Sequence, residues 1–201
     1  MIRPNLSILI PAAGASQRLG QAKQLVKYRN RALIQNTVHT ALSTDPLEII
    51  VVTGANATGV KNAIKDDEVR WIHNPDWSSG LGGSIALGAT GVSLESTGLM
   101  ILLCDQWRIE PQDLQHLVAK WRSSPGSIVV SEAGGLYTPP VIFPVACFKE
   151  LKQLKGQQGA RTVLNTHPEL LLPVTLENAA YDLDTPAHLE MIEKNNRDQL
   201  R

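Results

Sequence analysis

The chain has 201 residues, of which 43% are apolar and 19% are charged, as in a soluble globular protein with one domain spanning residues 1–201. Its formal net charge is zero, which argues against a nucleic-acid binder, and no apolar stretch approaches the length of a membrane span. The two cysteines, Cys104 and Cys147, form no C-x-x-C pair, and this fits a reducing, cytoplasmic setting.

Short apolar runs alternate with amphipathic segments along the chain. In order, we expect strands at 6–10, 48–53, 69–73, 99–104, 127–131, 140–143 and 170–174. Helices are expected at 31–42, 58–65, 83–90, 111–121, 146–154, 161–165 and from 186 onward, with a tail that frays after Lys194. This alternation predicts an α/β protein of three layers, a mostly parallel twisted sheet with helices on both faces.

A loop of mainly small residues follows the first strand and runs from Pro11 to Leu25. Small residues let the backbone approach a ligand and direct its N–H groups at an anion. Arg18 and Lys23 add the positive charge that a polyphosphate needs. The glycine spacing fits neither the Walker A pattern nor the dinucleotide fingerprint. We predict a phosphate-binding loop of a third kind, the alternative being an ordinary connection with solvated cations.

Two further features follow strands, so they are expected at the same edge of the sheet. Residues 80–84, Gly-Leu-Gly-Gly-Ser, form a second small-residue loop, and Asp105 follows the most apolar strand. A carboxylate there suits Mg²⁺, which takes one or two carboxylates together with substrate phosphates. Asp182 or Asp184 can supply a second carboxylate. The alternatives are a turn aspartate at 105 and acids that favour a helix N-terminus at 182 and 184.

Other side chains near Asp105 have simpler interpretations. Cys104 lies within an apolar run and is expected to be a buried core thiol, whereas Trp107 is expected to form a wall of the site. No histidine or cysteine spacing indicates zinc, and no G-x-S-x-G elbow indicates a hydrolase.

Four motifs together resemble the MobA-like nucleotidyltransferases. The first loop resembles the signature A-A-G-x-S-x-R-x-G-x-x-K-x-L, and residues 80–88 resemble the base-contacting loop of that family. Residues 102–106, Leu-Leu-Cys-Asp-Gln, resemble its metal-binding L-x-C-D-Q-P. Residues 156–161 and 182–186 resemble its G-D-x-G-A-R and D-I-D-T-P elements. The resemblance runs nearly end to end and implies the nucleotide-diphospho-sugar transferase fold.

The resemblance also implies roles for single residues. The nucleotide would be bound by Ala12, Ala13, Gly14, Ser16, Arg18 and Lys23 of the first loop and by Gly82, Gly83 and Ser84 of the second. The catalytic residues would be Lys23, Arg18 and Asp105, and Asp105 would bind Mg²⁺. Asp182 and Asp184 stay the two candidates for the second carboxylate ligand of the metal.

Within the family, the sequence is most similar to the molybdenum cofactor cytidylyltransferases. Pro11-Ala-Ala-Gly14 resembles their CTP-using loop, whereas guanylyltransferase relatives tend to carry L-A-G-G. The resemblance implies transfer of CMP from CTP to molybdopterin with release of pyrophosphate, and it allows for a molybdoenzyme partner. Three departures concern the presumed acceptor side, where Trp107, Gln157 and Pro139 replace a proline, an aspartate and a frequent histidine.

Two other functions stay open. One is a sugar- or alditol-phosphate nucleotidyltransferase built on the same first loop, and the other is a non-catalytic cofactor-binding chaperone for a maturing enzyme. We expect no nucleic-acid or membrane partner, and a monomer or weak dimer.

Overall fold

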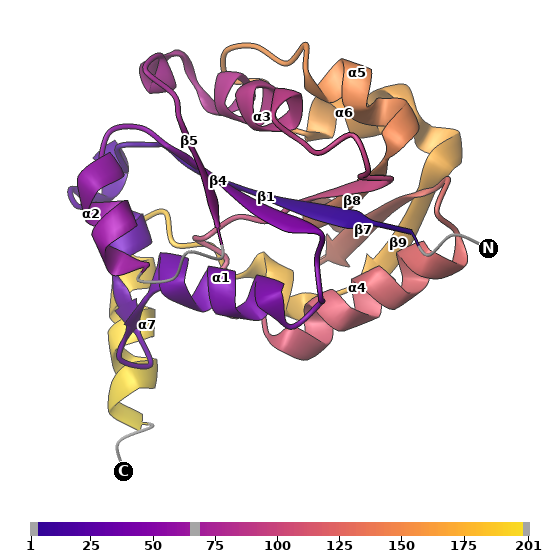
Figure 1. The fold of residues 1–201 in the computed structure, drawn as a ribbon. Helices are drawn as coiled ribbons and strands as arrows, with labels where there is room; N and C mark the ends of the chain where they lie inside the picture. The colour runs from indigo at the N-terminus through magenta and orange to yellow at the C-terminus, as the bar shows by residue number, and fades with distance from the viewer. Residues whose placement is uncertain (1–3, 65–68, 199–201) are drawn as a thin grey trace.

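A seven-stranded sheet forms the centre of the computed structural model, which describes residues 4–64 and 69–198 (Figure 1). Its strand order is β5-β4-β1-β6-β8-β7-β9. The strands are β1 Leu6–Ala12, β4 Glu48–Thr53, β5 Arg70–His73, β6 Gly98–Ile101, β7 Ile128–Ala133, β8 Leu136–Pro144 and β9 Leu171–Thr175. In this sheet β8 alone pairs antiparallel with its neighbours, so the expected mostly parallel sheet is confirmed.

Helices cover both faces of the sheet (Figure 1), which confirms the predicted three layers. One face carries α1 (Leu33–Leu42) and α4 (Pro111–Ser123), and the other carries α3 (Leu81–Thr90), α5 (Phe148–Leu151) and α6 (Arg161–Thr166). A small sheet of β2 (Lys27–Tyr28) and β3 (Arg31–Ala32) precedes α1, and α2 (Ala57–Ala63) follows β4. The last helix, α7 (Pro186–Asp198), extends away from the body. None of the helices described combines the length and apolar character needed to cross a membrane.

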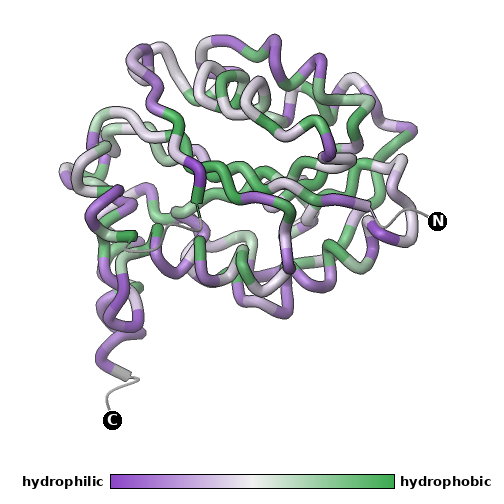
Figure 2. The backbone as a smooth tube through the Cα atoms, viewed as in Figure 1, coloured by the Kyte–Doolittle hydropathy of each residue, from purple (hydrophilic) through white to green (hydrophobic). Residues whose placement is uncertain are grey.

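The strand β1 lies at the centre of the core, and all seven of its residues are buried. The sequence of β1 is a nearly continuous apolar run, because parallel strands flank β1 and helices cover both of its faces. Ile8 and Ile10 pack into the cluster on the α1 side, whereas Leu9 packs into the cluster on the α3 side. Figure 2 shows the same division, with hydrophobic residues along the central strands and hydrophilic ones along α7.

The predicted starts of two helices, α4 and α7, are confirmed. Pro111 opens α4, and the Asp113 carboxylate accepts a hydrogen bond from the Glu110 N–H at 2.9 Å. Pro186 opens α7, and the Thr185 hydroxyl accepts a bond from the His188 N–H at 3.4 Å. These side chains satisfy N–H groups that the first helical turn leaves without partners.

The prediction that the chain frays after Lys194 is wrong as far as Asp198, where α7 ends. The Asn196 side chain ties the last turns of α7 to the β2 region, because it donates to the Lys27 carbonyl at 3.0 Å and accepts from the Arg29 N–H at 2.9 Å. Ile192 is fully buried in a cluster that includes Trp107 and Leu183. Packing of a distant segment, which local polarity does not show, therefore keeps the helix in place.

Several predicted boundaries also differ from the structure. The strand expected at 99–104 ends at Ile101, and the helix expected at 146–154 is the short α5 preceded by a 3-10 turn. The helix expected at 58–65 ends at Ala63, and the last predicted residue, 65, lies outside the described residues. In contrast, β8 begins four residues before the predicted strand at 140, because Gly134 and Gly135 form a tight turn with φ of 56° and 76°. Pro139 and Pro140 of β8 lie at a register shift, where strand pairing tolerates them.

Candidate active site

A cleft of about 520 Å³ opens at the carboxyl ends of β1 and β6. Its lining joins the first loop, the segment around residues 77–84, the turn after β6 and the segment before α7. The predicted site residues that line it are Ala13, Gly14, Ser16, Arg18, Lys23, Ser84, Asp105 and Asp184. The structure therefore brings together two loops and an acidic pair that are far apart in the sequence.

The other predicted residues lie beside this lining. Ala12 is buried at the end of β1, and its carbonyl faces a side chain beneath the loop. Gly82 is buried and Gly83 half-buried in the first turns of α3. Asp182 is half-buried and forms an isolated bridge with Gln106.

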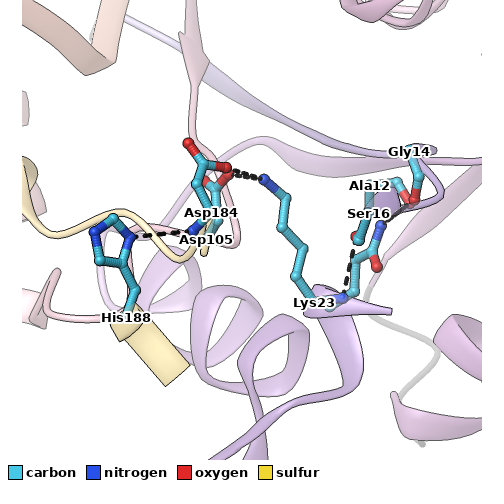
Figure 3. A network of polar contacts seen from close by, with 8 residues as sticks. Ala12, Gly14, Ser16, Lys23, Asp105, Asp184 and His188 are labelled. Atoms are coloured by element: carbon cyan, nitrogen blue, oxygen red, sulfur yellow. Dashed lines mark hydrogen bonds and ion pairs between the residues drawn. The ribbon is translucent and has the colours of Figure 1, made fainter. Parts of the chain in front are cut away.

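The first loop is folded back on itself by its own side chains. Ser16 adopts a left-handed conformation with φ of 56°, and its hydroxyl accepts a hydrogen bond from the Lys23 N–H at 3.1 Å. The Gln24 amide is buried, and its nitrogen donates to the carbonyls of Ala12 at 3.1 Å and Gly14 at 2.8 Å. Ala12 and Gly14 are both labelled in Figure 3. The beginning and the end of the loop thus face the same cleft.

Lys23 connects this loop to the acidic side of the cleft (Figure 3). Its ammonium group bonds the Asp105 carboxylate and lies 3.2 Å from an Asp184 oxygen. Burial lowers the pKa of Lys23, but the two carboxylates more than offset this effect and leave the pKa above its usual range. Lys23 is therefore a charged ammonium group throughout the neutral range.

Asp105 and Asp182 form the inner part of the acidic side. Burial raises the pKa of Asp182 to about 6, with repulsion from Asp105 and Asp184 adding to the shift. One carboxylate oxygen of Asp105 and one of Asp182 are buried without a hydrogen-bond partner among the described residues. Unpartnered, negatively charged oxygens are the donors that a hard divalent cation prefers.

These oxygens fit a Mg²⁺ ion that shares its coordination with a substrate. Within residues 4–64 and 69–198, no group of three or more His, Cys, Asp or Glu side chains is arranged to hold a metal ion alone. A site of one or two carboxylates, completed by phosphate oxygens and water, is the usual arrangement for Mg²⁺.

The second loop is packed against the segment 155–158, backbone to backbone. Gly80 has a φ of 128°, and the Gly82 N–H donates to the Gly156 carbonyl at 2.9 Å. A Cβ at residue 82 would lie 2.6 Å from the Gln158 carbonyl oxygen, so only glycine fits there without displacement. The nearby Ser84 hydroxyl is buried and accepts from the Asn74 amide at 3.0 Å.

Trp77, rather than Trp107, lines the cleft, so the expectation for Trp107 is wrong. Trp107 is 6% exposed and packs edge-on against Tyr28 at 5.0 Å and against Tyr181 at 6.2 Å. Arg108 covers the Tyr181 ring at 3.7 Å. Proximity to Asp105 in sequence did not indicate which way the indole points, and Trp77 precedes the second loop without a pattern of its own.

The turn after β6 is held by Gln106, which is buried and donates to the carbonyls of Pro139 at 2.6 Å and Ala179 at 2.9 Å. Cys104, just before it, is buried as predicted, and burial raises the pKa of its thiol to about 12. Of the three departures from the family pattern, Gln157 lines the cleft, whereas Trp107 and Pro139 do not. Sequence reasoning missed Gln24 and Gln106 as structural partners of the site, because a buried amide leaves no periodic signal.

Comparison with known proteins identifies the family of this chain. Residues 8–170 match the MobA-like NTP transferase domain. The chain is 31% identical over 206 residues to the purine catabolism protein PucB of Bacillus subtilis (strain 168), covering 96% of this chain and 98% of that protein. It is 30% identical over 193 residues to the nicotine blue oxidoreductase of Paenarthrobacter nicotinovorans, covering 90% and 93%.

Solved structures share the fold. Rv0371c from Mycobacterium tuberculosis H37Rv superposes with a TM-score of 0.83 at 22% identity, covering 96% of this chain and 99% of that one. A structure of the same protein in complex with manganese gives a TM-score of 0.81 at 21% identity, with 94% and 98% covered. Members of the matched family act on nucleoside triphosphates and phosphorylated acceptors and depend on a divalent metal ion. The chain belongs to the MobA-like NTP transferase family and is a nucleotidyltransferase.

Proposed function

We propose that this enzyme transfers CMP from CTP to molybdopterin in a Mg²⁺-dependent reaction that releases pyrophosphate. The observation that carries the proposal is the position of Lys23, which extends from the first loop to Asp105 and Asp184 in one cleft. Nucleotidyl transfer needs a polyphosphate and a divalent cation side by side. The contact of Lys23 with the two carboxylates places a cation suited to the polyphosphate next to ligands suited to the metal ion.

The reaction would proceed by in-line displacement. An oxygen of the acceptor phosphate attacks the α-phosphorus of CTP, the bond between that phosphorus and the oxygen bridging to the β-phosphate breaks, and pyrophosphate leaves. Arg18 and the N–H groups of the first loop would hold the triphosphate in line. Lys23 would turn from its carboxylates to the phosphate oxygens that gain charge, and so stabilise the transition state.

Asp105, with either Asp182 or Asp184 as the second carboxylate, would hold the Mg²⁺ ion. When bound, the ion neutralises charge on the transferring and departing phosphates. The unpartnered oxygens of Asp105 and Asp182 support this assignment, because each leaves a lone pair free for a cation. The Asp184 carboxylate is exposed and lies on the solvent side of these three carboxylates.

The choice of CTP rests on the resemblance of Pro11-Ala-Ala-Gly14 to the CTP-using loop. Ser84 lines the cleft together with Trp77, and the close contact of Gly82 with residues 155–158 holds the second loop in place beside them, which supports a base site at this end of the cleft. Gln157, in the cleft lining, is the candidate contact with the acceptor.

The direct test is pyrophosphate release from each of the four NTPs, with and without molybdopterin and Mg²⁺. We expect release only when CTP, molybdopterin and Mg²⁺ are all present. Release with a sugar phosphate or alditol phosphate in place of molybdopterin would identify the alternative transferase. Tight cofactor binding without any Mg²⁺-dependent turnover would identify the non-catalytic alternative.

The metal assignment is tested by Asp105→Ala. We expect this variant to fold and to lose pyrophosphate release by about a hundredfold or more, as is typical when a charge-positioning group is removed. Glu95→Ala removes an exposed carboxylate outside the cleft lining and should keep the wild-type rate. Turnover of Asp105→Ala at the wild-type rate would show that Asp105 does not hold the metal.

A further inference from the structure

We propose that Gln24 is a positioning residue that orients the first loop for the triphosphate, an inference that rests on the proposed function of the cleft. Gln24 is 1% exposed and is one of two buried glutamines beside the site. Its amide nitrogen donates to the carbonyls of Ala12 and Gly14, at the start of the loop. No motif of the sequence assigns it a role.

The two hydrogen bonds determine which polar groups of the loop face the cleft. A trans peptide unit is planar, and its C=O and N–H groups point in opposite directions. Because the Gly14 carbonyl is bonded to the Gln24 amide, the N–H of Ala15 points to the opposite side of this peptide unit. Ala15 lines the cleft, and its N–H has no partner among the described residues. Gln24 thus occupies two carbonyl oxygens that would otherwise repel a phosphate.

The same residue connects the two ends of the loop. Gln24 follows Lys23, whose N–H donates to the Ser16 hydroxyl at 3.1 Å. The pair Lys23–Gln24 therefore holds the segment 12–16 at three points: two carbonyls and one hydroxyl. A shift of the loop start would move the anion-binding N–H groups relative to the Lys23 ammonium.

The loop uses the donor of the Gln24 amide and not its acceptor. Its other amide atom, Oε1, is buried without a partner in the described structure, and an unpaired buried acceptor disfavours the folded state. A methionine would fill a similar volume without that penalty. Methionine has no N–H group to donate to the carbonyls of Ala12 and Gly14, so the N–H donor is the property of Gln24 that the site uses.

The test compares Gln24→Met and Gln24→Glu with the wild type by titration calorimetry with CTP and with CMP in the presence of Mg²⁺. Removing the donor in Gln24→Met should weaken CTP binding by about tenfold, because small misplacements of binding groups are costly. Gln24→Glu should weaken it further, because carboxylate oxygens then face carbonyl oxygens. CMP has no β- or γ-phosphate, so its affinity should change much less. Both variants should lower the melting temperature, because the two carbonyls lose their donor, and the readout of positioning is therefore the selective loss of CTP binding over CMP binding.

A matched control removes a similar buried bond elsewhere. Thr44 is 5% exposed, and its hydroxyl donates to the Ala41 carbonyl at 2.8 Å just after α1, away from the cleft. Thr44→Val should leave CTP binding unchanged. If Gln24→Met does not fold, Gln24→Asn, in which the amide is one methylene too short to reach the carbonyls, replaces it and should show the same selective loss.

The outcomes separate this proposal from the proposed function. Failure of the wild type to bind any NTP would contradict the proposed function itself. A wild type that binds CTP, with Gln24→Met binding it equally well, would overturn the role of Gln24. An equal loss of CTP and CMP binding would also overturn it, because that result describes a purely structural residue.

Discussion

Replacement of Lys23 by methionine tests the contact at the centre of the site. The side chains of Lys23 and Asp105 are 23% and 13% exposed, which places this ion pair between the surface and the interior. Breaking a fully buried pair costs about 3–5 kcal/mol, and an exposed pair contributes about 0–1 kcal/mol. We therefore expect Lys23→Met to lower the free energy of unfolding by about 1–3 kcal/mol at neutral pH, because two carboxylates lose their cation.

The measurement is urea-induced unfolding at neutral pH with and without Mg²⁺. Mg²⁺ should stabilise Lys23→Met more than the wild type, because in the wild type the cation competes with the ammonium group for the same carboxylates. Lys120→Met changes an exposed lysine of α4 and should show neither effect.

Two results together would refute this reasoning about Lys23. One is a Lys23→Met variant as stable as the wild type without Mg²⁺, and the other is an equal stabilisation of both proteins by Mg²⁺. They would mean that the ammonium group does not neutralise the acidic pair in solution.

Three further predictions follow from other contacts. Trp77→Phe should remove most of the tryptophan fluorescence change that CTP causes, whereas Trp107→Phe should retain it, since Trp77 lines the cleft and Trp107 does not. Gly82→Ala should lower the free energy of unfolding by about 1–3 kcal/mol, because its Cβ would meet the Gln158 and Lys155 carbonyl oxygens, while Gly126→Ala, with open space around it, should be nearly neutral in urea titrations. Glu150 raises the pKa of His167 by hydrogen bonding at 2.7 Å, so the stabilisation by this pair is complete at low pH and is lost as the pH rises through that raised pKa. The difference in melting temperature between the wild type and His167→Gln should therefore shrink from about pH 5 to about pH 9, and a constant difference would contradict the pairing.

The sequence predicted features that depend on local chemistry. The strand β1, the small-residue loop after it and Asp105 at the end of an apolar run were all recognisable, because burial and turn chemistry leave patterns in neighbouring residues. The placement of both loops and Asp105 at one edge also followed from the parallel sheet, since carboxyl ends of parallel strands share an edge.

The parts that could not be predicted depend on long-range packing. The directions of Trp77 and Trp107 are set by which cluster each ring joins, and spacing from Asp105 carries no information on this point. The continuation of α7 to Asp198 similarly depends on contacts with the β2 region. The contact of Lys23 with Asp184 was not predicted as an ion pair, because only the folded chain brings these residues together.

The ion pair between Lys23 and Asp184 spans 161 positions of the chain, and this separation has a consequence for synthesis. The first loop leaves the ribosome early, with β1, whereas its acidic partner at 184 emerges only after β9. A nascent chain that has passed the turn after β6 holds the loop and Asp105 but lacks the carboxylates at 182 and 184. The full set of charged side chains in this cleft is therefore present only in the final stage of translation.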